Sequence, residues 1–436
     1  MTDDHLTLLT NSIQAATSPF RNYLVDLYQQ YRHLQEGTKV VQVNSTTSDS
    51  DEFGICAVTV DGQIFEVGDT TSRFPLNTLA RALIYGMALE DRGRECVTQR
   101  VGVKPVGEAL NVILLDEFDH CPHNPIITTG AIATTNLIQG KTLTERLNRI
   151  LNMFRRYTGR ALTVDALAFS TAKSNGKRER AIANFLLPFN LLEGAIEDTL
   201  ELYFQQSTIL VNNRDVAMIG ATLANGGINP VTGEQALAAE YVQDVTSVIM
   251  SCGMYERSGE WMRRVGMPAQ PSITGALLAV VPQKLGLGIF SPYLDQWGNP
   301  IRAIRVCEAI SSDRHLHLFD IYARNQQMMK YIEQVNKVTA AAAALEQNTY
   351  DTHTLDDVVQ RTDELGQLAR MFKRMATQVK AREQQLQQQI QTLKIEIDKT
   401  TKDQKVAEIV ESESFQNLKQ KLERMKKNRD QRNSSP

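Results

Sequence analysis

The chain has 436 residues, a formal net charge of −3, 42% hydrophobic residues and 22% charged residues. This composition is that of an ordinary globular protein, and the nearly neutral charge gives no overall attraction to nucleic acid or to an anionic membrane. No stretch reaches the roughly 18 to 20 uninterrupted apolar residues that span a bilayer, and the acidic N-terminus lacks the features of a signal peptide. The five cysteines are scattered without a CxxC motif, which favours reduced thiols and a cytoplasmic location.

Periodic apolar residues predict a helix over residues 5–36. A β-hairpin is predicted from two β-rich runs, residues 55–60 and 63–67, that flank an Asp-Gly pair. The pattern is then mostly helical from residue 74 to about 250, apart from a glycine-rich loop at residues 226–233. Strands are predicted again at residues 276–281 and 287–290. Because the hairpin comes early and the other strands come late, we expect one sheet assembled from both ends of the domain, in an α+β fold.

The composition changes near residue 322, after which Gly and Pro are nearly absent and Gln, Lys, Glu and Ala dominate. Apolar residues recur every seven positions at Leu365, Phe372, Val379, Leu386 and Leu393. Companion apolar positions are Leu368, Met375 and, after a one-residue slip, Ile390 and Ile397. The pattern predicts a coiled coil with a stutter at Arg382, which falls on the seam. A solvated single helix is the alternative, although a single helix does not need an apolar stripe at heptad spacing.

Long phrases of the first 320 residues resemble the serine-dependent glutaminase family, whose fold is shared with β-lactamases and penicillin-binding proteins. The matching phrases include FGICAVTVDGQIFEVGD, RVGVKPVGEALN, LYFQQSTILVNNRDVAMIGATLANGGINPVTGE and GIFSPYLDQWGNPIRAIRVCEAIS. The resemblance implies a β-lactamase-like α+β domain over residues 1–322, with a sheet flanked by a helical subdomain. It also implies hydrolysis of L-glutamine to L-glutamate and ammonia, with no cofactor and no metal.

The family's reaction depends on an S-x-x-K motif, in which a neutral lysine activates the serine hydroxyl one helical turn away. Here the corresponding phrase is FPLNTLAR, so that Thr78 stands at the serine position and Arg81 at the lysine position. Threonine keeps a hydroxyl but adds a methyl group that stiffens the side chain. A guanidinium does not lose its proton in proteins, so Arg81 cannot be the general base.

Other positions that the resemblance assigns to the site are also altered. The residues that match substrate-binding positions are Thr128, Glu179, Tyr203, Tyr255 and Ile273. Thr128 replaces an expected asparagine, and Ala172 stands where the family has a carboxylate that pairs with the substrate ammonium. Tyr203 and Tyr255 are retained, although a tyrosine with one hydrogen-bonded hydroxyl is also a common core residue.

These replacements lead to the prediction of a glutaminase fold that no longer hydrolyses glutamine and acts in assembly, partner binding or ligand sensing. The alternative is an active glutaminase with Thr78 as the nucleophile and Tyr255 as the proton carrier. Binding of glutamine without turnover lies between the two. A metal site at His120, Cys121 and His123 is disfavoured because no second ligand cluster accompanies it.

The C-terminal region resembles a HAMP domain at the phrase DELGQL, residues 363–368, which is similar to the second HAMP helix. Residues 332–347 would form the first helix and residues 348–362 the connector. We therefore expect a HAMP-like dimerisation module over residues 323–380, followed by a coiled coil and a basic tail over residues 381–436. The expected partner is a second or further copy of the chain. A glutamine-like small molecule and a protein bound through the coiled coil are the other candidates, and neither nucleic acid nor a membrane span is expected.

Overall fold

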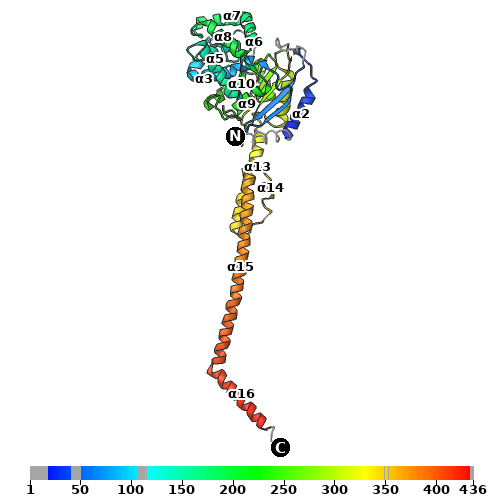
Figure 1. Cartoon of the computed structure of the whole chain (residues 1–436), viewed down its shortest axis with the longest axis vertical. Coiled ribbons are helices and arrows are strands. Elements are labelled where there is room, and N and C mark those ends of the chain that lie inside the picture. The colour runs from blue at the N-terminus through cyan, green and yellow to red at the C-terminus, as the bar shows by residue number, and fades with distance from the viewer. Residues whose placement is uncertain are drawn as a thin grey trace. The chain divides into compact units, whose positions relative to one another are not determined.

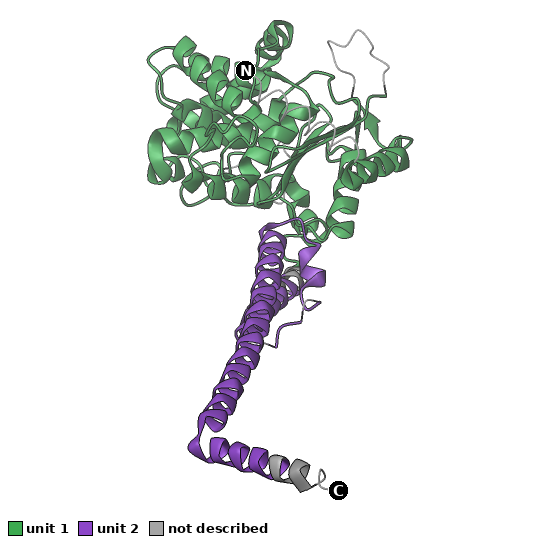
Figure 2. Ribbon diagram, turned by 60° about the horizontal axis from the view of Figure 1, so that its bottom comes forward, with its two compact units in different colours: residues 1–321 green, residues 322–436 purple. Residues whose placement is uncertain are grey.

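The computed structural model describes residues 18–40, 51–106, 113, 115–347, 349–351 and 353–432. The chain forms two compact units, residues 1–321 and residues 322–436 (Figures 1 and 2). The first unit is α+β, as predicted, and is built around a five-stranded antiparallel sheet. Its strand order is β3-β2-β8-β7-β6. The strands are β2 (Gly54–Thr59), β3 (Ile64–Gly68), β6 (Ala269–Pro271), β7 (Ala276–Val281) and β8 (Leu285–Phe290).

The predicted hairpin is confirmed, because β2 pairs with β3 in an antiparallel register that places Ala57 opposite Phe65. β2 also pairs with β8, so that strands from both ends of the unit lie side by side in one sheet. β8 begins two residues earlier than predicted, since Leu285 still pairs with Val281 of β7. The predicted first helix ends earlier than expected: α2 spans Pro19–Tyr31 and is capped by the Ser18 side chain. The part of the prediction before residue 18 lies outside the described residues.

Each face of the sheet is covered by helices. Helix α9 (Asn213–Ala224) covers one face, and its N-terminus is closed by a capping box between Asn212 and Asp215. Glycines allow this helix to lie close to the sheet: a Cβ added to Gly286 of β8 would lie 2.0 Å from the backbone nitrogen of Ala221. The other face packs against α2 and α12 (Ile301–Asp313). Successive side chains of each strand point to opposite faces of the sheet, so the hydrophobic core is divided between these two faces.

A helical subdomain lies beside the sheet (Figure 1). Its helices are α3 (Ala80–Thr98), α4 (Thr128–Leu137), α5 (Leu143–Thr158), α6 (Ala166–Asn175), α7 (Lys177–Leu186) and α8 (Ile196–Ser207). Helices α10 (Ala239–Cys252) and α11 (Ser258–Arg264) lead back to the sheet. Two short strand pairs complete the unit, β1 (Thr38–Lys39) with β9 (Tyr293–Leu294) and β4 (Phe74–Pro75) with β5 (Leu210–Val211).

The second unit is helical. It consists of α13 (Ile321–Glu346), α14 (Asp356–Val359), α15 (Glu364–Glu411) and α16 (Glu413–Arg432). Asp363 caps α15 by accepting a hydrogen bond from the Gly366 N–H. Gln334 of α13 contacts Arg361 just before α15, and the Tyr350 carbonyl just after α13 accepts from Lys380 of α15. Because both contact pairs run in the same direction, α13 and α15 are parallel. In the described part of the chain, no helix is long and apolar enough to cross a membrane.

Candidate active site

Thr78 lies at the start of the helical subdomain, where β4 passes through a single 3-10 turn, η1 (Asn77–Leu79), into α3. Its side chain is 1% exposed, and its hydroxyl donates a hydrogen bond of 2.9 Å to the carbonyl of Pro271 on β6. Gln270, on the same strand, donates through Nε2 to the Thr78 carbonyl at 2.5 Å. The end of β6 therefore fixes both the backbone and the hydroxyl of Thr78.

Arg81 lies one turn further along α3 and is 7% exposed. Its guanidinium donates to the Ile126 carbonyl at 2.5 Å, to the Tyr203 hydroxyl at 3.0 Å and to Thr128 Oγ1 at 3.4 Å. All three acceptors are neutral, and among the described residues no carboxylate pairs with Arg81. A buried cation without a counter-ion favours negative charge on any group beside it.

Tyr255 is the third member of the cluster. It begins the 3-10 turn η3 (Tyr255–Arg257) after α10, and its buried hydroxyl has no hydrogen-bond partner in the described part of the chain. Burial raises the pKa of this phenol, whereas the positive charge of Arg81 and the Thr78 hydroxyl both oppose the rise. The three residues with predicted catalytic positions, Thr78, Arg81 and Tyr255, thus lie together.

Two residues of the cluster have left-handed backbone conformations. Asn77, directly before Thr78, has φ = +48°, and Tyr255 has φ = +52°. Asparagine tolerates this region through its short polar side chain, but a bulky tyrosine is strained there. Strain of this kind concentrates at functional sites, because the surrounding structure must hold the residue in place.

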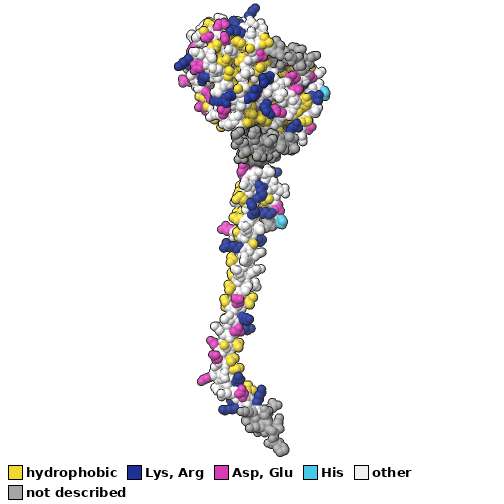
Figure 3. Space-filling view, in the orientation of Figure 1, with side chains coloured by type: hydrophobic (Ala, Val, Ile, Leu, Met, Phe, Trp, Pro, Cys, Tyr) yellow, Lys and Arg dark blue, Asp and Glu magenta, His cyan; other side chains and the backbone are white. Residues whose placement is uncertain are grey.

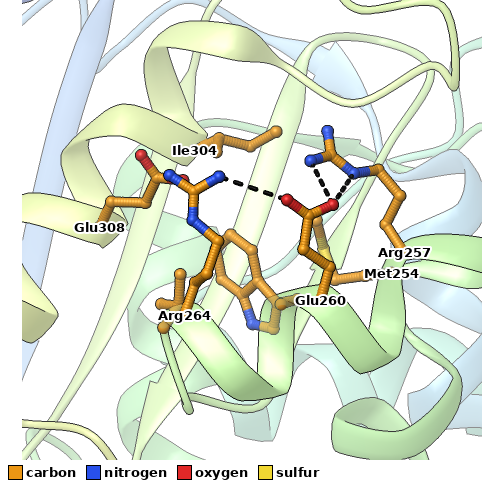
Figure 4. Close-up of a pocket in the computed structure, with 8 residues that line it drawn as sticks. Met254, Arg257, Glu260, Arg264, Ile304 and Glu308 are labelled. Carbon is orange, nitrogen blue, oxygen red and sulfur yellow. Dashed lines mark hydrogen bonds and ion pairs between the residues drawn. The ribbon is translucent and has the colours of Figure 1, made fainter.

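Ion pairs hold the segment that carries Tyr255. Figure 4 shows the Glu260 carboxylate between the guanidinium groups of Arg257 and Arg264, at 2.7 and 3.3 Å. Arg264 also pairs with Glu308 of α12 at 2.9 Å. These groups surround a cavity of only about 10 Å³, which is the space of a single water molecule. The cavity is therefore part of the support for η3 and α11 rather than a substrate pocket.

Two residues from the predicted substrate-binding set do not join this cluster through any described contact. Glu179 is half-buried on α7, and Ile273 is 45% exposed in the turn between β6 and β7. The backbone N–H of Ile273 has no hydrogen-bond partner among the described residues, and it follows Pro271 and Ser272 directly along the chain.

Sequence reasoning missed Gln270 and the Ile126 carbonyl. Gln270 is fully buried, which is uncommon for a glutamine, and no local pattern in the sequence marks it. A backbone carbonyl leaves no trace in the sequence. Among the described residues, no group of three or more His, Cys, Asp or Glu side chains could hold a metal ion.

The family model for glutaminase matches residues 44–319. A glutaminase from Microcystis aeruginosa is 48% identical over 324 residues, covering 74% of this chain and 96% of the relative. A glutaminase from Trichormus variabilis is 46% identical over 309 residues, covering 71% and 92%. The resemblance of the C-terminal region to HAMP domains has no support in these comparisons and stays a prediction.

Solved structures agree with the sequence matches. The crystal structure of Mglu in its tris and glutamate form is 34% identical, with a TM-score of 0.66 over 70% of this chain and 68% of that one. A Bacillus glutaminase structure is 28% identical, with a TM-score of 0.63 over 69% and 99%. The first unit therefore has the glutaminase fold.

The prediction of a non-hydrolytic protein is wrong. Relatives that are 46–48% identical over 92–96% of their own lengths are glutaminases, which supports the alternative of an active enzyme. The prediction rested on several replacements taken together, at Thr78, Arg81, Thr128 and Ala172. On the family model, the relatives and the solved structures together, the chain belongs to the glutaminase family.

Proposed function

We propose that this protein hydrolyses the side-chain amide of L-glutamine to L-glutamate and ammonia, with Thr78 as the nucleophile. The observation that carries the proposal is the buried group of two hydroxyls and one cation, Thr78, Tyr255 and Arg81, in a chain that matches glutaminases over nearly their whole length. A buried hydroxyl beside a second, unpartnered hydroxyl is the arrangement that nucleophilic catalysis requires.

In the first half of the reaction, Thr78 Oγ1 forms a bond with the amide carbon of glutamine. The proton of Oγ1 now points to the Pro271 carbonyl, and rotation about the Cβ–Oγ1 bond redirects it to Tyr255 without moving the oxygen. Tyr255, as the phenolate, accepts this proton and then donates it to the leaving nitrogen, which departs as ammonia. The product of this step is a γ-glutamyl ester of Thr78.

Arg81 acts on the proton acceptor rather than as one. Its charge is permanent, lies in a buried site and lacks a carboxylate partner among the described residues, so it stabilises the phenolate of Tyr255 relative to the phenol. The same charge favours the oxyanion that forms when the Thr78 oxygen attacks. An arginine at the position of the family's lysine thereby keeps an electrostatic role while the proton transfer moves to Tyr255.

In the second half, water attacks the ester carbon, Tyr255 accepts a proton from the water, and the Thr78 oxygen leaves with a proton. Glutamate is released and the enzyme is restored. The unpartnered N–H of Ile273 is the candidate donor to the oxyanion in both halves. Thr128, Tyr203 and Glu179 are the candidate contacts of the amino-acid end of the substrate.

The test is ammonia release from glutamine by the purified full chain and by two variants of Thr78. Thr78→Val keeps the shape of the side chain but removes the hydroxyl, and we expect the rate to fall at least about 10³-fold. Thr78→Ser keeps the hydroxyl, and we expect its rate to stay within about tenfold of the wild type. Thermal unfolding of all three proteins checks that they are folded. An unchanged rate for Thr78→Val, or no glutamine-dependent ammonia from the wild type, contradicts the proposal.

The role of Tyr255 has a separate test in the pH dependence of kcat/KM. Because the phenolate is the active form and burial raises the phenol pKa, the rate should rise about tenfold per pH unit through neutral and mildly alkaline pH. Tyr255→Phe should lose this slope together with most of the rate. A flat profile for the wild type would show that another group carries the proton.

We also infer a cytoplasmic location, which is supported by five cysteines that are all free of disulfide bonds. The HAMP-like character of residues 323–380 is part of the same proposal. It is supported by the parallel course of α13 and α15 and by the connector between them, which packs its Tyr350, Leu355 and Val358 side chains into the core of the second unit.

A further inference from the structure

Most of α15 has no packing partner within the chain. Its first turns bury Leu365, Ala369 and Ala376 against α13 and the connector, but no side chain between residues 381 and 411 is buried. Helices of globular proteins owe most of their stability to packing of an apolar face. A 48-residue helix with more than half of its length uncovered therefore lacks the contacts that ordinarily maintain a helix.

An apolar stripe with one interruption nevertheless continues along the uncovered part. Figure 3 shows hydrophobic side chains along much of the length of α15. Its large apolar side chains are about half exposed: Leu368, Met371, Met375, Val379, Leu386, Ile390, Leu393 and Ile397. An exposed apolar stripe of this extent on a folded protein marks a surface that another molecule covers.

The spacing of the apolar residues in the stripe indicates what kind of molecule binds to it. Steps of three and four residues run from Leu365 to Val379 and again from Leu386 to Ile397, which is the heptad spacing of a coiled-coil seam. The partner must then be a helix with the same repeat, aligned nearly parallel to α15. A membrane surface or a globular partner would not require apolar residues to return at every second turn over more than 30 positions.

The residues beside the seam suit a second copy of the same helix. In the uncovered part they are mainly uncharged, as at Gln385, Gln387 and Gln389, so two copies meet there without like-charge repulsion. The one interruption, between Val379 and Leu386, holds Arg382 and Glu383.

We propose that α15 pairs with α15 of a second copy of this chain, in parallel and in register, with residues 386–397 at the centre of the seam. The parallel choice follows from the interruption of the repeat. An antiparallel pair that aligned the interruptions of both copies would set residues 386–397 of one copy against residues 365–379 of the other, and that stretch already packs in part on α13 and the connector. The pairing is independent of the proposed glutaminase reaction.

Disulfide trapping in the full chain tests this arrangement. In a parallel, in-register pair, each seam residue faces its own equivalent at a Cα separation suited to a disulfide, about 4.4–6.8 Å. Leu393→Cys should therefore form a covalent dimer in high yield under mild oxidation. Gln388→Cys, which places the thiol on the outer side of the same helix, should stay at the background of the wild type, whose five native cysteines are the same in both variants.

A second pair of substitutions separates seam contacts from chance collisions. On the Leu393→Cys background, Leu386→Glu with Ile390→Glu puts two charges into the seam and should reduce the dimer yield at least about tenfold. The matched control, Gln384→Glu with Gln391→Glu, adds the same charges on the outer face and should leave the yield unchanged. Equal yields for the seam and outer thiols, or insensitivity of the Leu393→Cys dimer to the seam charges, would overturn the proposal.

Discussion

Replacing Gly286 by alanine should separate α9 from the sheet. The added Cβ would lie 2.0 Å from the Ala221 nitrogen and 2.3 Å from the Gly220 carbon, and both are backbone atoms of α9. An ordinary contact needs at least 3.4 Å, so that the helix would have to move away by 3.4 − 2.0 = 1.4 Å. Side-chain adjustment cannot relieve such a clash. Because 11 of the 12 residues of α9 are buried, the movement would loosen the core on that face of the sheet.

We expect Gly286→Ala to lower the free energy of unfolding by about 3 kcal/mol or more, at or above the upper end of typical overpacking costs. Urea unfolding followed by circular dichroism measures the change. Gly259→Ala on α11 is the matched control, since nothing lies within 4 Å of its added Cβ, and it should be neutral or stabilising by up to about 1 kcal/mol. A loss of less than about 1 kcal/mol for Gly286→Ala would refute the argument that glycine sets the distance between α9 and the sheet.

Three further predictions follow from the ion pairs and the site. Arg302→Leu should lower the free energy of unfolding by about 3 kcal/mol in the same urea assay, because the fully buried guanidinium donates to Asp51 and to the Leu34 carbonyl, each at 2.7 Å, and its loss removes this donor from both acceptors. Asp363 has its pKa lowered to about 2, chiefly by hydrogen bonds from Arg361. A lowered native pKa contributes stability above the unfolded value of about 3.9, and this contribution is lost as the pH falls toward 2. The helical signal of the wild type should therefore decline in that window, and Asp363→Asn should show a weaker decline from a lower starting stability; identical acid transitions would contradict this. Arg81→Met should shift the rising limb of the kcat/KM profile to higher pH, since the cation that favours the Tyr255 phenolate is removed, whereas an unshifted limb would exclude that role.

The elements that the sequence predicted well are those with strong local periodicity. The hairpin at Asp61-Gly62 depends on turn chemistry and alternation, and the long C-terminal helix on its heptads, so neighbouring residues carry the information. The environment of Thr78 could not be predicted in this way. Its hydroxyl and carbonyl are held by Pro271 and Gln270, about 190 positions away, through contacts that exist only in the folded chain.

The error about activity has a similar origin. The motif comparison identified Arg81 at the position of the expected base. It is correct that an arginine cannot accept the proton, but this does not exclude a different proton acceptor. The comparison named Tyr255 as the proton carrier of the alternative, but the effect of Arg81 on that phenol depends on tertiary proximity rather than on spacing along the chain. A substitution that removes one proton acceptor is informative only when the other groups around the nucleophile are also known.

The left-handed backbone at Tyr255 places stability and activity in opposition at one residue. A bulky residue in this region costs on the order of 1–2 kcal/mol, which glycine or asparagine there would largely avoid. Selection for stability by directed evolution should find replacements at position 255 readily, and each of them should cost the phenol that the reaction needs.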